Sequence, residues 1–217
     1  DMNNDGIVDA VHVIFAGAGE ASTGEESAIW PHRWSFYPSD TFDIEFDGVR
    51  LKDYSCSAEM MGAGMDGIGT LCHEFGHVLG LPDLYDTDYE GSGGQATAIN
   101  KWSIMASGSY NNFSNTPASF TAYEKYKLNW LQLDTLQIAG EYVLPSLMDS
   151  NRAYVITTPI EDEFFVFENR RRISWDAYIP NDGGLIYHVK GRGDYDINSN
   201  PAYQRYDIEE ADRDDSE

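Results

Sequence analysis

The chain of 217 residues, 41% of them hydrophobic, is long enough to bury a substantial core, either as one large domain or as two small ones. Its 14 Lys and Arg residues stand against 37 Asp and Glu residues, and the formal charge of -23 argues against nucleic acid or an anionic membrane surface as a partner. No apolar run is long enough to span a membrane, so membrane insertion is not expected.

The acidic excess suits either a secreted protein that binds divalent cations or simply a strongly solvated surface. The sequence begins within an acidic motif at Asp1 and ends in a charged run over 212–217. We therefore expect a fragment that lacks a leader and a propeptide and is truncated in its C-terminal part. Cys56 and Cys72 are the only cysteines, so at most one disulfide is possible, and the sequence leaves open whether they pair.

The first nine residues resemble the start of an EF-hand calcium loop. Oxygen-bearing side chains surround Gly6, at Asp1, Asn3, Asp5 and Asp9. The position of the bidentate Glu is occupied by His12, which excludes a complete EF-hand. A smaller calcium loop and an Asx-rich turn both remain open.

Two strand-like stretches follow the acidic loop. Residues 10–16, Ala-Val-His-Val-Ile-Phe-Ala, predict a buried strand in which His12 has a structural role. Residues 42–51 predict a hairpin around Asp47-Gly48, a pair suited to a type I′ turn. The edge of this hairpin is a candidate to hold an extended peptide by strand addition.

Apolar residues at helical spacing over 68–79 predict a helix with one face in a core and the other facing a cleft. Cys72 lies on the apolar face and is expected to be buried as a small hydrophobe. Asp66 is the expected N-cap. Gly80 followed by Pro82 ends the helix and predicts a sharp turn.

The polar face of this helix has the residues of a zinc hydrolase. His73 and His77 are one turn apart, so both imidazoles can reach one metal ion. Glu74 flanks them, where a carboxylate can take a proton from a zinc-bound water whose pKa is lowered to roughly 7. Because a catalytic zinc usually has three protein ligands and one open position, Asp83, beyond the turn, is the expected third ligand. The alternatives left open for that ligand are Asp86, Glu90 and Glu124.

The remainder of the chain predicts a loop, a helix and then strands. Residues 86–94 are acidic and rich in Gly, which predicts a flexible loop, with a second cation site as the alternative. Residues 119–131 predict a second long helix, N-capped by Ser119, that packs behind the active-site floor. From Gly140 the pattern changes to strands, over 142–144, 152–157, 164–168 and 185–189.

This change of pattern predicts a catalytic domain over 1–139 and a β-rich extension over 140–217. Within the extension, Glu168, Arg170 and His188 are expected to be structural, because nothing pairs them with a nucleophile.

The string H-E-x-x-H-x-x-G-x-x-D from His73 to Asp83 resembles the elongated zinc motif of the metzincins, with Asp in place of the usual third His. The segment W-S-I-M-A-S-G-S-Y over 102–110 resembles their methionine turn, which implies that Met105 forms an apolar floor beneath the metal. Tyr110, five residues after Met105, is a candidate hydrogen-bond donor to the oxyanion.

The longer string H-E-F-G-H-V-L-G-L-P-D-L-Y-D resembles the immune inhibitor A family of secreted bacterial zinc metallopeptidases, and the segments F-F-V-F-E-N-R and W-D-A-Y-I-P-N-D-G-G-L-I-Y-H-V resemble the part of that family after the catalytic core. The resemblance implies an α+β fold. Its core would be a metzincin-like sheet with an active-site helix and a backing helix, followed by the β-rich extension.

Together these observations predict a secreted bacterial zinc metalloendopeptidase that hydrolyses polypeptide substrates by a metal-activated water, with Glu74 as general base. Zinc is the expected cofactor, with calcium as a further one, and the sequence does not predict an oligomeric state. Two alternatives remain open. One is a catalytically inactive, metal-stabilised binding or adhesion module, and the other is a zinc hydrolase that acts on a non-peptide amide or ester.

Overall fold

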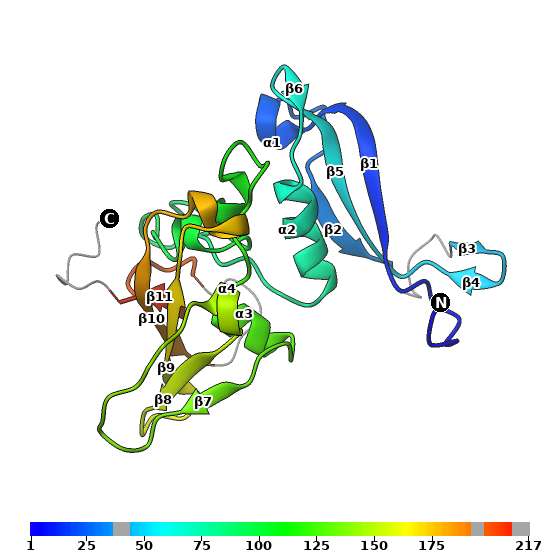
Figure 1. The fold of residues 1–217 in the computed structure, drawn as a ribbon. Helices are drawn as coiled ribbons and strands as arrows, with labels where there is room; N and C mark the ends of the chain where they lie inside the picture. Colours follow the sequence, from blue (N-terminus) through cyan, green and yellow to red (C-terminus); the bar gives the residue numbers. More distant parts are fainter. Residues whose placement is uncertain (37–43, 192–197, 210–217) are drawn as a thin grey trace.

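The structure is a computed structural model that describes residues 1–36, 44–191 and 198–209. It confirms a mixed α and β fold in which sheets predominate and helices are few and short (Figure 1). The charged run over 212–217 lies outside the described residues. Among the residues described, no helix is both long and apolar enough to cross a membrane.

The N-terminal sheet has the strand order β1-β5-β2. The strand β1 (Val11–Ala18) runs parallel to β5 (Asp53–Met61), and β2 (His32–Ser35) runs antiparallel to β5 on its other side. A short β6 (Gly64–Met65) folds back on the end of β5, and the four-residue helix α1 (Glu20–Thr23) connects β1 towards β2.

The strand predicted over 10–16 is present as β1, but it is not buried. Val13 and Ile14 are 46% and 61% exposed, although consecutive residues of a strand point to opposite faces. β1 pairs with β5 alone, and the helix α2 (Gly69–Val78) packs over β5 and β2, so β1 lies at an uncovered edge. His12 has the structural role predicted for it, because its Nδ1 and Nε2 lie 2.8 and 2.9 Å from the hydroxyls of Ser55 and Ser57.

The predicted hairpin forms a separate two-stranded sheet of β3 (Glu45–Phe46) and β4 (Val49–Arg50). Asp47 and Gly48 have φ of 52° and 81°, as the predicted type I′ turn requires. Residues 42–43 of the prediction lie outside the described residues. The hairpin projects at one edge of the molecule, apart from α2 (Figure 1), and its expected role as a peptide-binding edge stays a prediction.

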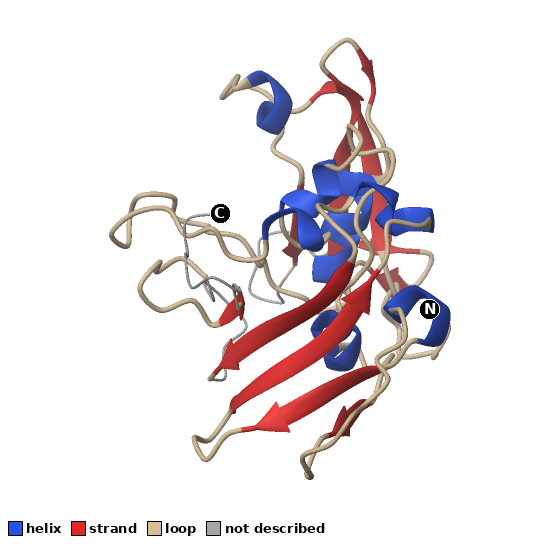
Figure 2. Ribbon diagram, turned by 60° about the vertical axis from the view of Figure 1, so that its left-hand side comes forward, coloured by secondary structure: helices blue, strands red, loops and turns tan. Residues whose placement is uncertain are grey.

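The larger sheet has the order β11-β10-β9-β8-β7, in which β7 and β8 are parallel and the other neighbours antiparallel. Its long strands lie side by side in Figure 2. Its strands are β7 (Leu133–Thr135), β8 (Ala153–Thr157), β9 (Glu163–Arg170), β10 (Gly183–Lys190) and β11 (Tyr206–Ile208). Three of the predicted strands correspond to β8, β9 and β10. The fourth, over 142–144, is irregular, because it leads through Pro145 into the helix α4 (Leu147–Ser150) and finds no strand partner.

The remaining described helices are short, and they comprise one α-helix, α3 (Ala122–Lys127), and three 3₁₀ segments, η1 (Asn100–Trp102), η2 (Ser107–Tyr110) and η3 (Ser174–Tyr178). The second predicted helix is therefore shorter than expected. Its N-cap is Thr121, not Ser119, because Thr121 and Glu124 form a reciprocal capping box. Ser119 instead donates its hydroxyl to Asp176, 2.8 Å away.

One buried apolar cluster joins residues on both sides of Gly140. β7, before this glycine, and β8, after it, are neighbours in one sheet. The cluster comprises Leu81, Leu84, Ile99, Ile104, Met105, Ala106, Ala122, Leu131, Leu147, Ala153, Val166, Tyr187, Val189 and Tyr206. The segments after α2 and the larger sheet thus share a core.

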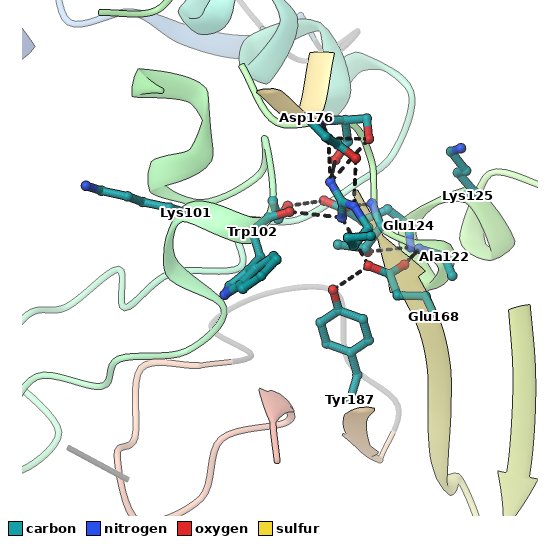
Figure 3. Close-up of polar contacts among 12 residues, drawn as sticks. Lys101, Trp102, Ala122, Glu124, Lys125, Glu168, Asp176 and Tyr187 are labelled. Carbon is teal, nitrogen blue, oxygen red and sulfur yellow. Dashed lines mark hydrogen bonds and ion pairs between the residues drawn. The ribbon is translucent and has the colours of Figure 1, made fainter. Parts of the chain in front are cut away.

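Arg170, at the end of β9, is a fully buried cation, and its carboxylate partners Glu168 and Asp176 are labelled in Figure 3. Its guanidinium donates to both carboxylate oxygens of Asp176, at 2.7 and 2.8 Å, and to Glu168, at 3.0 Å. It also donates to the carbonyl of Trp102, at 3.2 Å. Burial alone would raise the pKa of Asp176, but the bonds from Arg170 outweigh it and leave that pKa lowered. The structural role predicted for Glu168 and Arg170 agrees with these contacts.

Replacing Arg170 with Met should destabilise the protein by about 3–5 kcal/mol, because it leaves Glu168 and Asp176 buried without their cation. Urea unfolding measures the change. The neighbouring Arg171 is 53% exposed in its pair with Asp149, so Arg171→Met should cost about 0–1 kcal/mol. Equal losses in the two variants would contradict this account.

Candidate metal centre

The helix α2 brings two imidazoles together, and the turn after it adds a carboxylate. The ring centroids of His73 and His77 are 4.8 Å apart. Asp83 Oδ1 lies 3.1 Å from His73 Nε2 and 3.2 Å from His77 Nε2. Among the described residues, these three form the group of His, Cys, Asp and Glu side chains that is close enough to share a metal ion.

The turn that returns Asp83 to the helix depends on Gly80. Its φ of 101° lies in the region that favours glycine. The amide of Leu81 donates to the Gly76 carbonyl at 3.0 Å, so the chain folds back directly after the helix. The sharp turn predicted at this position is confirmed.

The hydrogen bonds of the two imidazoles fix which nitrogens face Asp83. His73 Nδ1 lies 2.8 Å from the Ile104 carbonyl and His77 Nδ1 lies 2.7 Å from the Leu81 carbonyl. A carbonyl only accepts, so each Nδ1 carries a proton, and in the neutral ring each Nε2 presents a lone pair.

The third atom of this group is also an acceptor. Asp83 Oδ1 is buried and has no hydrogen-bond donor. Two ligands about 2.0–2.1 Å from a tetrahedral zinc are about 3.3 Å apart, close to the separations found here. The three ligand atoms therefore fit a tetrahedral zinc ion.

Glu74 lies beside the three atoms and is buried, with 7% of its surface exposed. Burial raises its pKa, and the nearby imidazoles oppose the rise without cancelling it. Glu74 and His73 line two adjoining cavities of 640 and 550 Å³. Both cavities are also lined by Trp30, Pro31 and Tyr85, so together they form one cleft that runs past the carboxylate.

The environment of α2 differs from the amphipathic prediction. The helix contacts β5, β2 and η2, and its predicted cleft face does line the two cavities, through Thr70, His73, Glu74 and His77. On the predicted core face, Ile68 and Leu79 are 41% and 38% exposed, while Cys72 is partly buried against the core cluster. The buried residues of the helix are Gly69, Thr70, His73, Glu74 and Gly76.

The helix also begins later than predicted. Its N-cap position is Ile68, with no side-chain cap, so the expected N-cap Asp66 is wrong. The amide of Gly69 donates to the Ser114 carbonyl at 2.9 Å, so backbone from the loop over 109–114 takes the place of a capping side chain.

Met105 is fully buried against Gly76 of α2. A Cβ added to Gly76 would lie 2.4 Å from Met105 Sδ, so this glycine lets the thioether approach the helix. Ser103 fixes the turn, because its hydroxyl accepts from the Met105 amide at 2.9 Å and donates to Glu124 at 2.5 Å.

Two tyrosines lie near the site. Tyr110, the candidate oxyanion donor, is 52% exposed and lines the larger cavity with Glu74. Sequence reasoning missed Tyr85, whose ring centroid is 6.2 Å from that of His73 and which lines both cavities. Its position two residues after Asp83, within the same turn, is the signal that could have found it. His32, given no role from sequence, lies in β2 and contacts the Tyr54 hydroxyl at 2.8 Å.

The alternative third ligands are not part of this group. Both carboxylate oxygens of Asp86 accept backbone amides, from Asp88 at 3.1 Å and Ala96 at 2.8 Å, and so shape the following loop. Glu124 is occupied by Ser103 and by its helix cap. Glu90 is exposed in the loop over 86–94.

The side-chain oxygens of the acidic N-terminal loop accept hydrogen bonds largely from donors within the loop itself. The carboxylate of Asp1 accepts the amides of Asp5 and Gly6, at 2.9 and 3.0 Å, and Asn3 donates to Asp5 at 3.0 Å. Asp9 instead pairs with the N-terminal amino group at 3.0 Å. Cys56 and Cys72 are both free.

Residues 1–142 match the protein family described as immune inhibitor A peptidase M6, catalytic domain. Immune inhibitor A of Bacillus thuringiensis subsp. alesti is 37% identical over 136 residues, which cover 56% of this chain and 18% of that protein. Pre-pro-metalloprotease PrtV of Vibrio cholerae is 28% identical over 197 residues, which cover 76% of this chain and 21% of that protein. The chain thus spans about a fifth of the length of the curated relatives it matches.

Adding a methyl group at Gly76 should destabilise the protein. In Gly76→Ala, the overpacking against Met105 should cost about 1–3 kcal/mol, which exceeds the gain of about 1 kcal/mol that Ala has over Gly in a helix. Urea unfolding measures this cost, and the same substitution in a Met105→Ala background should lose the penalty. A stabilised Gly76→Ala single variant would contradict the close packing.

Proposed function

Because this chain belongs to the immune inhibitor A family of peptidases, we propose that it is the catalytic part of a secreted bacterial zinc metalloendopeptidase. The observation that carries the proposal is the convergence of three acceptor atoms, His73 Nε2, His77 Nε2 and Asp83 Oδ1, with no proton donor among them. Such a set is electrostatically complete only with a cation. The name of the Vibrio relatives, a pre-pro-metalloprotease, supports both the activity and the export of the protein.

In this proposal His73, His77 and Asp83 hold zinc, as in a metzincin whose third His is replaced by Asp. When bound, zinc lowers the pKa of a water molecule and polarises the scissile carbonyl. Glu74 accepts a proton from the attacking water and later delivers it to the leaving amine. Its buried position beside the ligand atoms suits both steps, because a general base must lie within reach of the proton that it accepts.

The cleft supports a polypeptide as the substrate. β2 is an edge strand of the N-terminal sheet, and its four residues line the smaller cavity beside the metal ligands. An extended peptide could add to this edge through main-chain hydrogen bonds. We therefore propose β2, which lies beside the metal ligands, as the edge for strand addition ahead of the hairpin predicted over 42–51. Met105 as the floor and Tyr110 as an oxyanion donor complete the proposed site.

Calcium binding by the N-terminal loop is a further part of the proposal. The side-chain oxygens of Asp1, Asn3 and Asp5 gather there around backbone amides, and Asp9, the fourth predicted ligand, lies beside the N-terminal amino group. The division into a catalytic domain over 1–139 and an extension over 140–217 also stays a prediction about the whole protein.

Replacing Glu74 with Gln should leave zinc bound but lower casein cleavage by about 10²–10⁴-fold or more, because the general base is lost. His77→Ala should lose the metal itself. Elemental analysis and a casein digest measure both effects, with Glu90→Gln as a control that changes an exposed carboxylate. Full activity in Glu74→Gln would overturn the mechanism. Cleavage of small amides or esters without casein would favour a non-peptide hydrolase, and zinc binding with no hydrolysis would favour a binding module.

Calcium added to the zinc-loaded protein should raise its melting temperature, because a ligand that binds only the folded state stabilises it. At a calcium concentration 100 times Kd the stabilisation is about 2.7 kcal/mol. The shift should be smaller in Asp1→Asn or Asp5→Asn than in wild type. An identical melting curve with and without calcium would count against the loop as a site.

A further inference from the structure

The residue directly after the third ligand is held on both sides of its backbone. The amide of Leu84 donates to the Met105 carbonyl at 2.8 Å, and the carbonyl of Leu84 accepts from Asn198 Nδ2 at 3.0 Å. Leu84 is 1% exposed and belongs to the core cluster. The peptide group between Asp83 and Leu84 is therefore fixed to the floor of the site, and the next one, between Leu84 and Tyr85, to the C-terminal part of the chain.

Asn198 is fully buried and uses both ends of its amide. Its Nδ2 also donates to the Tyr206 carbonyl at 2.8 Å. Its Oδ1 accepts the amides of Arg205 and Tyr206, at 3.1 and 3.0 Å. Because these bonds orient the side-chain amide from the β11 side, its donor to Leu84 is held in a fixed direction.

Other contacts join the same two regions. Thr87 Oγ1 lies 2.9 Å from the hydroxyl of Ser199, and the amide of Ala98 donates to Gln204 Oε1 at 2.7 Å. The stretch from Asp83 to Ala98 is thus attached at several points to residues 198–206, which lie beyond the family match over 1–142.

We propose that Asn198 is a positioning residue for the metal centre, which it completes by fixing the Leu84 carbonyl and hence the direction of the Asp83 carboxylate. This inference rests on the proposed zinc site. Asp83 Oδ1 must lie near two imidazole nitrogens without any hydrogen bond of its own to hold it there. The position of Asp83 Oδ1 in the absence of metal therefore depends on the backbone of Asp83. Mutation of a residue that orients a metal ligand without binding the metal itself typically lowers metal affinity by about 10–100-fold.

A positioning role and a purely structural role predict different measurements. Loss of a structural contact lowers the stability of the protein and leaves the intrinsic affinity of the folded site for zinc unchanged. Loss of a positioning contact lowers that affinity in the folded protein, so that activity falls at limiting zinc and returns when zinc is added in excess.

The test compares Asn198→Ala with Asn169→Ala in the full chain. Asn169 is a matched control, because its Nδ2 also donates to a backbone carbonyl, that of Leu144 at 3.0 Å, at a half-buried position in the larger sheet. Zinc affinity is measured by competition with a chromogenic chelator, and the stability of the metal-free protein by urea unfolding. We expect zinc binding about 10–100-fold weaker in Asn198→Ala and unchanged in Asn169→Ala. Excess zinc should restore casein cleavage by Asn198→Ala.

Unchanged zinc affinity in a folded Asn198→Ala would overturn the inference. If that variant does not fold, Asn198→Gln, which keeps the amide but displaces it by one methylene, gives the same readout and the same criterion. The proposed function fails separately, if wild type itself binds no zinc or cleaves no peptide. A wild-type protein that does both, together with an unimpaired Asn198 variant, refutes only the positioning role.

Discussion

The structure depends on one constraint: three atoms with lone pairs, His73 Nε2, His77 Nε2 and Asp83 Oδ1, must lie close together with no proton between them. Two of them are fixed by backbone carbonyls, since Ile104 and Leu81 each accept the Nδ1 proton of one imidazole. The third belongs to the Asp83 carboxylate. In water such atoms would each find a donor, so the fold must hold them together against their own solvation. The buried floor, the turn at Gly80 and the contacts to Leu84 supply that restraint.

The buried network around Arg170 makes the metal site easier to interpret. Both places gather carboxylates away from water, but at Arg170 the cation is part of the protein and its donors reach both Glu168 and Asp176. At Asp83 the surrounding side chains supply acceptors only, once the imidazoles are neutral. A buried network in which every acceptor has a donor is explained by its structural role alone. A buried group of acceptors that lacks a donor or cation indicates a missing partner. This contrast is the physical reason for assigning function to one cluster and a structural role to the other.

Local pattern was sufficient for the central part of the site. The spacing of His73 and His77 and the glycine turn before Asp83 are properties of a short stretch, and their geometry follows from the helix period. What the sequence could not predict depends on distant neighbours. Val13 is exposed because α2 covers other strands, and the expected cap at Asp66 is replaced by backbone from a later loop. The contacts to the second sheet, which link residues far apart along the chain, leave no periodic signal at all.

The separation of these contacts along the chain has a consequence for biosynthesis. Asn198 follows Leu84 by 114 residues, and Arg170 follows Trp102 by 68. Translation proceeds from the N-terminus, so the ribosome delivers the histidine helix long before the strands that brace it. A nascent chain therefore carries the two histidines and Asp83 before the contacts to Leu84 from Asn198 can form. The surroundings of the three candidate ligands are therefore completed only late in synthesis, once the residues around Asn198 have been made.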